Sequence, residues 1–270
     1  MTLARSCLWA AAVCWVFSVL VTGCTLPPPA RSDTTKDRVT DSDETDGSKR
    51  SRVRMELATA YFSRGQLTTA LDEVKQALAV NPNLGDAYNL RGLIYAGLGD
   101  DALAQESFKR ALQINPADGD SMHNYGWYLC QQKRYNEAEA LFAQAIALPQ
   151  YTATGRTMLT SGVCQARAGK WAEAEATLSK AYERDPSNPA TAVNLSEVLL
   201  HRGEAERARF YIRRVNAVAN QSNAQTLWLA ARIEVKLGNR QAANEFGLQL
   251  RNRFPQSRES SAFDRGQFDE

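Results

Sequence analysis

The sequence predicts an all-α fold, a right-handed superhelix built from six helix–turn–helix repeats. The main observation is a 34-residue spacing of small residues and prolines, seen in Ala70/Ala104/Ala138, Ala77/Ala111/Ala145 and Pro82/Pro116. A second series of glycines falls at mid-unit, where a first helix would end: Gly65, Gly99, Gly169, Gly203 and Gly238. No strand pattern accompanies these repeats, so a stack of helix pairs is the architecture they favour.

The composition argues against most enzyme classes. The 270 residues carry 32 basic and 30 acidic side chains, a balance that gives little attraction for nucleic acid. The two histidines, His123 and His201, fall in different repeats with no cysteine or carboxylate at metal-ligand spacing, and are expected at the surface or in a groove. No nucleophile has a recognisable base beside it. We therefore expect no catalytic residue, no cofactor, no metal and no small-molecule substrate.

Residues 1–23 have the organisation of a signal peptide. Arg5 precedes an apolar run from Cys7 to Val21, which is short for a membrane-spanning helix. The run ends in Val21-Thr22-Gly23-Cys24, which resembles a bacterial lipobox with Cys24 as the lipid-bearing first residue of the mature chain. An uncleaved signal anchor is the alternative. Lipoproteins with a residue other than Asp after that cysteine are sorted to the outer membrane, so the resemblance implies a lipid-anchored protein on its periplasmic face.

Residues 24–50 are expected to form a flexible tether. The segment contains three consecutive prolines and mixed charges, and its only aliphatic side chains larger than Ala are Leu26 and Val39. Such a composition buries too little apolar surface to order itself. As a random coil it would span roughly 25–30 Å, enough to hold a folded domain away from a membrane.

The repeats are placed at 51–84, 85–118, 119–154, 155–188, 189–223 and 224–257, with a two-residue insertion before the fourth. A small residue recurs in each first helix, where it lets two helices approach closely: Ala58, Gly92, Gly126, Gly162, Ser196 and Ala231. Larger residues such as Phe108, Phe142 and Leu178 fill the space opposite. Units five and six are expected to pack more loosely, because Asn220 replaces a proline and Gly247 replaces a large residue. Residues 258–270 form either a capping helix or a frayed tail.

Two cysteines remain in the mature repeats. Cys130 and Cys164 lie in the first helices of units three and four, which pack side by side in such a stack. An oxidising periplasm favours a disulfide between them. Two buried free thiols, each packing as a small hydrophobic side chain, are the alternative.

The unit pattern resembles the tetratricopeptide repeat, most closely in unit two with Tyr88, Gly92, Tyr95, Ala104, Phe108, Ala111 and Pro116. In that family, first-helix positions 2, 5, 9 and 12 face a concave groove. The resemblance places an apolar partner-binding groove at Met55, Thr59, Phe62, Leu93 and Trp127. A register error of one residue would make them core residues instead. The family's carboxylate clamp is absent, since Met55, Thr59 and Leu90 occupy its positions.

A lipobox, a tether and six such repeats resemble the PilF/PilW family of type IV pilus pilotins. The runs DAYNLRGLIYAGLGDDALAQESFKRALQINP and DGDSMHNYGWYLCQQKRYNEAEALFAQAI carry this resemblance. It implies a non-enzymatic assembly factor that binds the type IV pilus secretin through its groove and promotes secretin localisation and multimerisation in the outer membrane. The alternative is a repeat lipoprotein that scaffolds peptidoglycan hydrolases or outer-membrane protein assembly, because one fold serves many partners.

Overall fold

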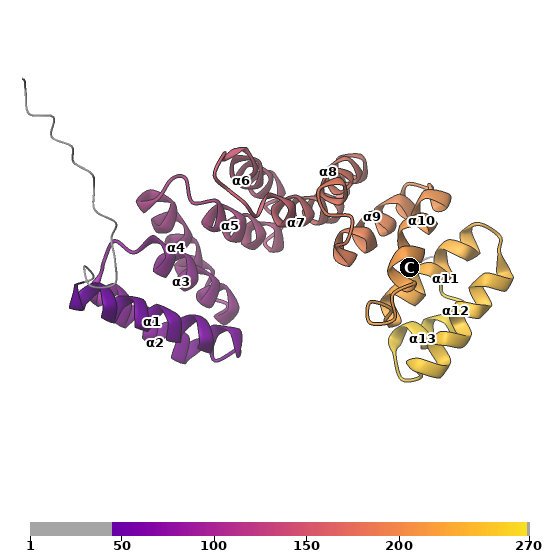
Figure 1. Cartoon of the computed structure of the whole chain (residues 1–270), viewed down its shortest axis with the longest axis horizontal. Coiled ribbons are helices and arrows are strands. Elements are labelled where there is room, and N and C mark those ends of the chain that lie inside the picture. Colours follow the sequence, from indigo (N-terminus) through magenta and orange to yellow (C-terminus); the bar gives the residue numbers. More distant parts are fainter. Residues whose placement is uncertain (1–44, 269–270) are drawn as a thin grey trace, which may run out of the picture. The chain divides into compact units, whose positions relative to one another are not determined.

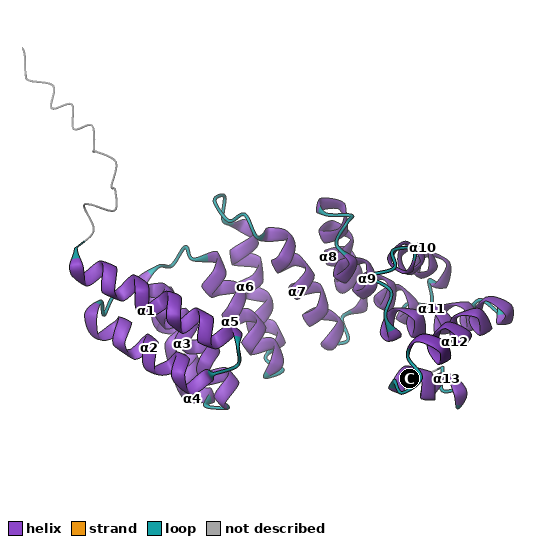
Figure 2. Ribbon diagram, turned by 60° about the horizontal axis from the view of Figure 1, so that its bottom comes forward, coloured by secondary structure: helices purple, strands orange, loops and turns teal. Residues whose placement is uncertain are grey.

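The computed structural model describes residues 45–268, and within them it contains thirteen α-helices and no strand. Figure 1 shows the helices following one another along the chain, and Figure 2 shows the short loops that join them. The prediction of an all-α repeat fold is confirmed. The helices are α1 (Asp46–Ser63), α2 (Leu67–Val80), α3 (Gly85–Leu98), α4 (Asp101–Ile114), α5 (Gly119–Gln131), α6 (Tyr135–Ala147), α7 (Thr154–Arg167), α8 (Trp171–Arg184), α9 (Pro189–His201), α10 (Ala205–Asn216), α11 (Ala224–Lys236), α12 (Arg240–Arg253) and α13 (Arg258–Asp264).

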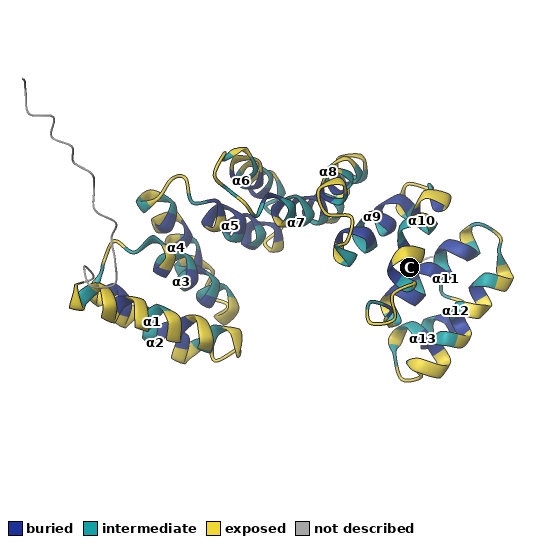
Figure 3. Ribbon diagram, viewed as in Figure 1, coloured by how far each residue is buried: buried dark blue, intermediate teal, exposed yellow. Residues whose placement is uncertain are grey.

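The first twelve helices form six successive pairs. Each odd-numbered helix packs on the even-numbered helix that follows it, and α3, α5, α7, α9 and α11 also contact one another in sequence. The first helices therefore lie side by side along one face of the stack. Figure 3 shows the buried residues on the helix faces that meet neighbours and the exposed residues on the outer faces. Within the described range, no helix is both long and apolar enough to span a lipid bilayer.

Glycines end the first helices because the chain must turn with a left-handed backbone there. Gly65, Gly99, Gly169, Gly203 and Gly238 all have φ between 72° and 81°. In unit three the equivalent position is Lys133, whose φ of 60° makes it the one non-glycine residue of the described chain with positive φ. The second helices of units one, two, three, four and six end two residues before a proline, which cannot continue a helix.

Small residues in the first helices allow the close approach that the sequence predicts. A Cβ atom on Gly92 would lie 2.7 Å from the ring of Phe108, and one on Gly126 would lie 2.7 Å from the ring of Phe142. Both rings are fully buried. In units two and three, a glycine facing an aromatic ring therefore sets the spacing of the two helices.

The N-terminal end of the repeat stack differs from the sequence expectation, whereas the C-terminal end matches one of its two alternatives. Helix α1 begins at Asp46, so its first turn lies inside the segment expected to be a tether. The Thr45 side chain accepts a hydrogen bond from the Ser48 backbone N–H at 3.1 Å, and this cap lets the helix start early. At the other end, residues 258–264 form the capping helix α13.

Helix α13 also corrects the expectation of loose packing in unit six. Phe263 of α13 fills the space opposite Gly247 of α12, which no side chain of unit six occupies. Phe263 joins Leu227, Ala231 and Leu250 in a separate buried cluster.

Candidate partner-binding site

The first repeat carries a hollow of about 850 Å³ on the exposed side of α1. Met55 and Thr59, two of the predicted groove residues, lie in its wall. Met55 is half-buried and Thr59 is exposed. The lining comes from α1 and from the α2–α3 connection with the start of α3: Ser48, Ser51, Arg52, Met55, Glu56, Thr59, Ala60, Ser63, Asn81, Leu84 and Asp86.

Contacts with α2 fix which face of α1 is exposed. Ala58 is fully buried, and the Ser51 hydroxyl donates to the Ala77 carbonyl at 3.3 Å. Arg54 pairs with Glu73 of α2 at 2.8 Å. With these three residues turned toward α2, the face that carries Met55 and Thr59 is left to form the hollow.

The rim of the hollow on the α3 side is acidic. Desolvation raises the pKa of Asp86, and the negative charges of Asp118 and Asp120 raise it further. On α1, Arg52 pairs with Glu56 at 2.9 Å, so this side carries both signs of charge. The site offers an apolar floor with the Asp86 carboxylate at the α3 edge, which suits a segment with apolar side chains and a basic one.

The other predicted groove residues lie elsewhere. Phe62 is half-buried and packs on the core cluster of units one and two rather than lining the hollow. Leu93 and Trp127 are half-buried against the next core cluster, and the Arg167 guanidinium lies 4.8 Å from the centre of a Trp127 ring. The structure therefore groups Met55 with Thr59 and separates both from the remaining three.

His123 is buried, contrary to the expectation of a surface or groove position. Its Nδ1 lies 2.9 Å from the Thr157 Oγ1 of α7, and only 8% of the residue is exposed. Burial lowers its pKa to about 4, with a further lowering by Arg156 and an opposing effect of Asp120. The two-residue insertion explains the burial, because it carries Tyr151, whose hydroxyl lies 3.0 Å from the same Thr157 oxygen and whose ring packs against Gly119.

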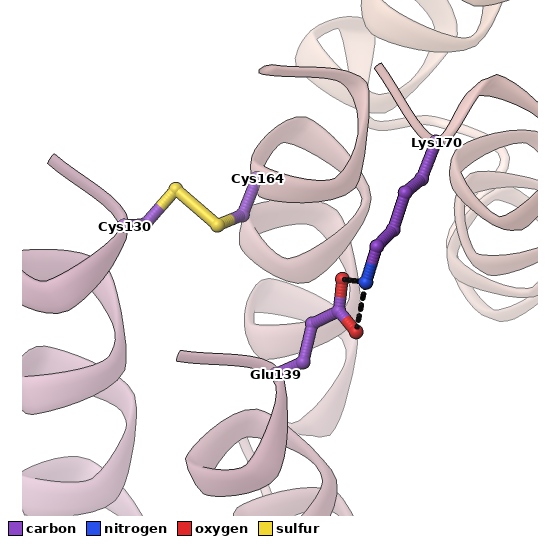
Figure 4. Close-up of a disulfide and its surroundings, with 4 residues drawn as sticks. All are labelled: Cys130, Glu139, Cys164 and Lys170. Carbon is purple, nitrogen blue, oxygen red and sulfur yellow. Dashed lines mark hydrogen bonds and ion pairs between the residues drawn. A yellow bond between two sulfur atoms is a disulfide. The ribbon is translucent and has the colours of Figure 1, made fainter. Parts of the chain in front are cut away.

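A disulfide joins Cys130 of α5 to Cys164 of α7. The two Cα atoms are 5.9 Å apart, and both residues are buried. Figure 4 shows the disulfide between the two helices with the Lys170–Glu139 ion pair beside it. That pair, with N–O distances of 3.0 Å, also links unit three to the start of α8. Units three and four are therefore joined by a covalent and an ionic link.

Sequence reasoning missed two charged clusters near the C-terminus. Glu234 of α11 is 1% exposed and pairs with Arg213 of α10 at 2.8 Å, while Arg209 lies 3.7 Å away. On the first-helix face, Arg232 pairs with Glu197 at 2.9 Å, and Lys236 lies one helical turn further on. Glu197 and Arg232 both hold groove position 9 of their units, and this coincidence of opposite charges is the signal that could have indicated the second cluster.

The described residues contain no group of three or more His, Cys, Asp or Glu side chains that could hold a metal ion. His201 instead stacks on Trp171, with ring centroids 4.3 Å apart. Cys24 and the segment before residue 45 lie outside the described residues, so the lipobox, the lipid anchor and the rest of the tether stay predictions.

Comparison with known proteins supports the repeat assignment. Residues 58–99 match a family described as TPR repeat, and residues 85–150 and 165–233 match families described as tetratricopeptide repeat. Among curated proteins, the type IV pilus assembly protein PilF of Pseudomonas aeruginosa is 26% identical over 256 residues, covering 94% of this chain and 97% of PilF.

Solved structures agree with the sequence comparison. The crystal structure of PilW, described as a widely conserved type IV pilus biogenesis factor, is 32% identical with a TM-score of 0.73, covering 78% of this chain and 97% of that chain. A structure of Pseudomonas aeruginosa PilF is 25% identical with a TM-score of 0.71, covering 82% of this chain and all of that one. Because the identity to PilW and PilF extends over nearly the whole length of both proteins, the chain belongs to the PilF/PilW family of tetratricopeptide-repeat proteins of type IV pilus biogenesis.

Proposed function

We propose that this protein is an outer-membrane lipoprotein that acts as a pilotin, binding the type IV pilus secretin and promoting its localisation and multimerisation. The observation that carries the proposal is the similarity to PilF over 94% of this chain. The signal sequence and Cys24 supply the membrane address, and the repeats supply the surface for a protein partner. No catalytic group is required for this role.

The hollow on α1 is the proposed contact with the secretin. Its volume of about 850 Å³ accommodates several apolar side chains of a partner segment around Met55 and Thr59. Asp86 at the rim would attract a basic residue of that segment. Met55 would thus provide apolar contact with the segment. Asp86 would orient the segment and raise the rate at which it associates.

The contact is tested by binding of the purified secretin periplasmic region to the variants Met55→Asp and Thr59→Glu. Each places a charge in the hollow, and we expect about tenfold or greater loss of affinity. Leu248→Asp is the matched control, because it makes the same type of change at a 54% exposed leucine of α12. Thermal unfolding identifies any variant that loses its fold. Binding equal to that of the control by both folded variants would exclude the α1 hollow as the site.

The pilotin role itself is tested in a strain that lacks the gene. Outer-membrane fractions are blotted for heat-resistant secretin multimers, and we expect the multimers to be lost. Normal multimers in the outer membrane would contradict the proposal and favour a scaffold for peptidoglycan hydrolases or outer-membrane protein assembly. A Cys24→Ser variant tests the anchor separately, with loss of lipid labelling and of membrane association as the expected result.

A further inference from the structure

The last two repeats and α13 together carry an excess of positive charge. Residues 45–188 contain 16 basic and 16 acidic side chains, whereas residues 189–268 contain 12 basic and 7 acidic ones. The α1 hollow at the opposite end of the repeat series is lined by one basic side chain, Arg52, and two acidic ones, Glu56 and Asp86. The basic C-terminal region therefore offers a partner a different set of charges from the α1 hollow.

A second hollow, of about 350 Å³, lies on the first-helix face of this basic region. Leu200 and Val235 give it apolar walls, and three potential cations surround them: His201, Arg232 and Lys236. The Arg232 side chain is only 11% exposed and is held by Glu197. Lys236 is exposed and forms no ion pair within residues 45–268, so its charge is available to a ligand.

The chain's own Phe268 occupies part of this surface. Its ring stacks on Trp228 of α11, with centroids 5.3 Å apart and planes inclined by 27°. Its backbone carbonyl accepts a hydrogen bond from Arg232 Nε at 3.3 Å. Phe268 follows the end of α13, so a non-helical piece of chain is bound here by an aromatic stack and a backbone hydrogen bond. Both are features of peptide recognition.

A further hollow, of about 530 Å³, lies beside Trp228 and adds Arg258 and Arg265 to the basic surroundings. Glu259 is the one acidic residue in its wall. The aromatic pair Trp228–Phe268 thus stands between two basic hollows. An aromatic side chain flanked by carboxylates complements this arrangement, because the ring can replace Phe268 while the carboxylates meet Lys236 and Arg265.

We propose that the surface formed by Leu200, His201, Trp228, Arg232, Val235 and Lys236 is a second protein-docking site, which binds an acidic peptide segment containing an aromatic residue. Phe268 covers this site in the free protein and is displaced when the partner segment binds. The site is separate from the α1 hollow, so the protein can hold two different partner segments at once.

The test uses a fluorescein-labelled peptide with the sequence of residues 266–270, GQFDE, and measures anisotropy with the purified protein. In Phe268→Ala the competing ring is absent, and we expect the peptide to bind about tenfold more tightly than to the unaltered protein, which must first release its own segment. The peptides GQFNQ and GQADE, which lack the carboxylates or the ring, should bind more weakly than GQFDE.

Charge at the site is tested by adding Lys236→Gln to Phe268→Ala, which should weaken peptide binding about threefold. Lys180→Gln is the matched control, since Lys180 of α8 is also exposed and forms no ion pair in the described chain. If Phe268→Ala disturbs α13 in thermal unfolding, Phe268→Leu keeps apolar contact without the ring and should show an intermediate gain.

Two results would overturn the proposal. One is the absence of saturable GQFDE binding to either Phe268 variant up to about 1 mM. The other is equal binding by the Lys236 and Lys180 variants. Sedimentation of Phe268→Ala with phosphatidylglycerol vesicles, without peptide binding, would assign the basic surface to anionic lipid instead.

Discussion

The ring of Phe263 in α13 occupies the place where a side chain on Gly247 of α12 would lie. A Cβ atom on Gly247 would be 2.2 Å from two atoms of the ring, closer than any side chain could approach. In units two and three this place is taken by Phe108 and Phe142 of the second helix itself. Unit six therefore receives its large side chain from the helix that follows it, which makes α13 part of the last repeat.

Replacing Phe263 with Ala should lower the free energy of unfolding by about 3–4 kcal/mol, because a ring that is 8% exposed leaves a cavity in the last cluster. Urea denaturation measures the change. Phe210→Ala is the control, with an effect below about 0.5 kcal/mol, since Phe210 is 55% exposed. Combining Phe263→Ala with Gly247→Leu should recover part of the loss. Equal stabilities of the Phe263 and Phe210 variants would contradict this account of α13.

Lys133→Gly should stabilise the protein by about 0.5–1 kcal/mol. Lys133 has a φ of 60°, where a Cβ atom is unfavourable, and it is exposed, so little packing is lost on substitution. Gly99→Ala is the opposite change at the equivalent place in unit two, where φ is 81°, and should destabilise by about 1 kcal/mol. Thermal or urea unfolding of the two variants gives the comparison. A loss of stability in Lys133→Gly would show that the lysine makes a compensating contact.

The sequence was sufficient to predict the repeats because their determinants are local. Glycines such as Gly65 and Gly99, and prolines such as Pro82, act through the backbone of their own turn, so their spacing alone marks the helix ends. In units two, three and four the small residue of the first helix faces a large residue 16 positions later, as Gly92 faces Phe108, which keeps the contact within one unit.

The site was harder to predict because its determinants are not local. His123 occupies a groove position by register, but Tyr151 and Thr157 from the insertion and the next unit cover it. Phe62 holds a similar position and packs on the core instead of lining the hollow. The contact of Arg232 with Phe268 joins residues 36 apart along an irregular tail, and no repeat pattern encodes it.

Reducing the Cys130–Cys164 disulfide should lower the free energy of unfolding by about 3–4 kcal/mol, because the bond closes a loop with a sequence separation of 34 residues in the unfolded chain. Urea denaturation with and without a reducing agent measures this loss. The double variant Cys130→Ala/Cys164→Ala provides the control, since its stability should not respond to the reducing agent. An unaltered protein equally stable in both conditions would show that the two thiols are not joined in solution.

Stability should fall as the pH is lowered from about 6.5 to about 4, through the buried His123. Burial holds its folded-state pKa at about 4, below the ordinary value of 6.5 that applies in the unfolded chain. Between these values the unfolded state binds a proton that the folded state does not, so protonation favours unfolding. The full difference corresponds to about 3 kcal/mol, and below about pH 4 this contribution levels off.

Urea denaturation across this range should show a shallower pH dependence for His123→Asn than for the unaltered protein. A slope for His123→Asn as steep as that of the unaltered protein would mean that His123 is not the titrating group.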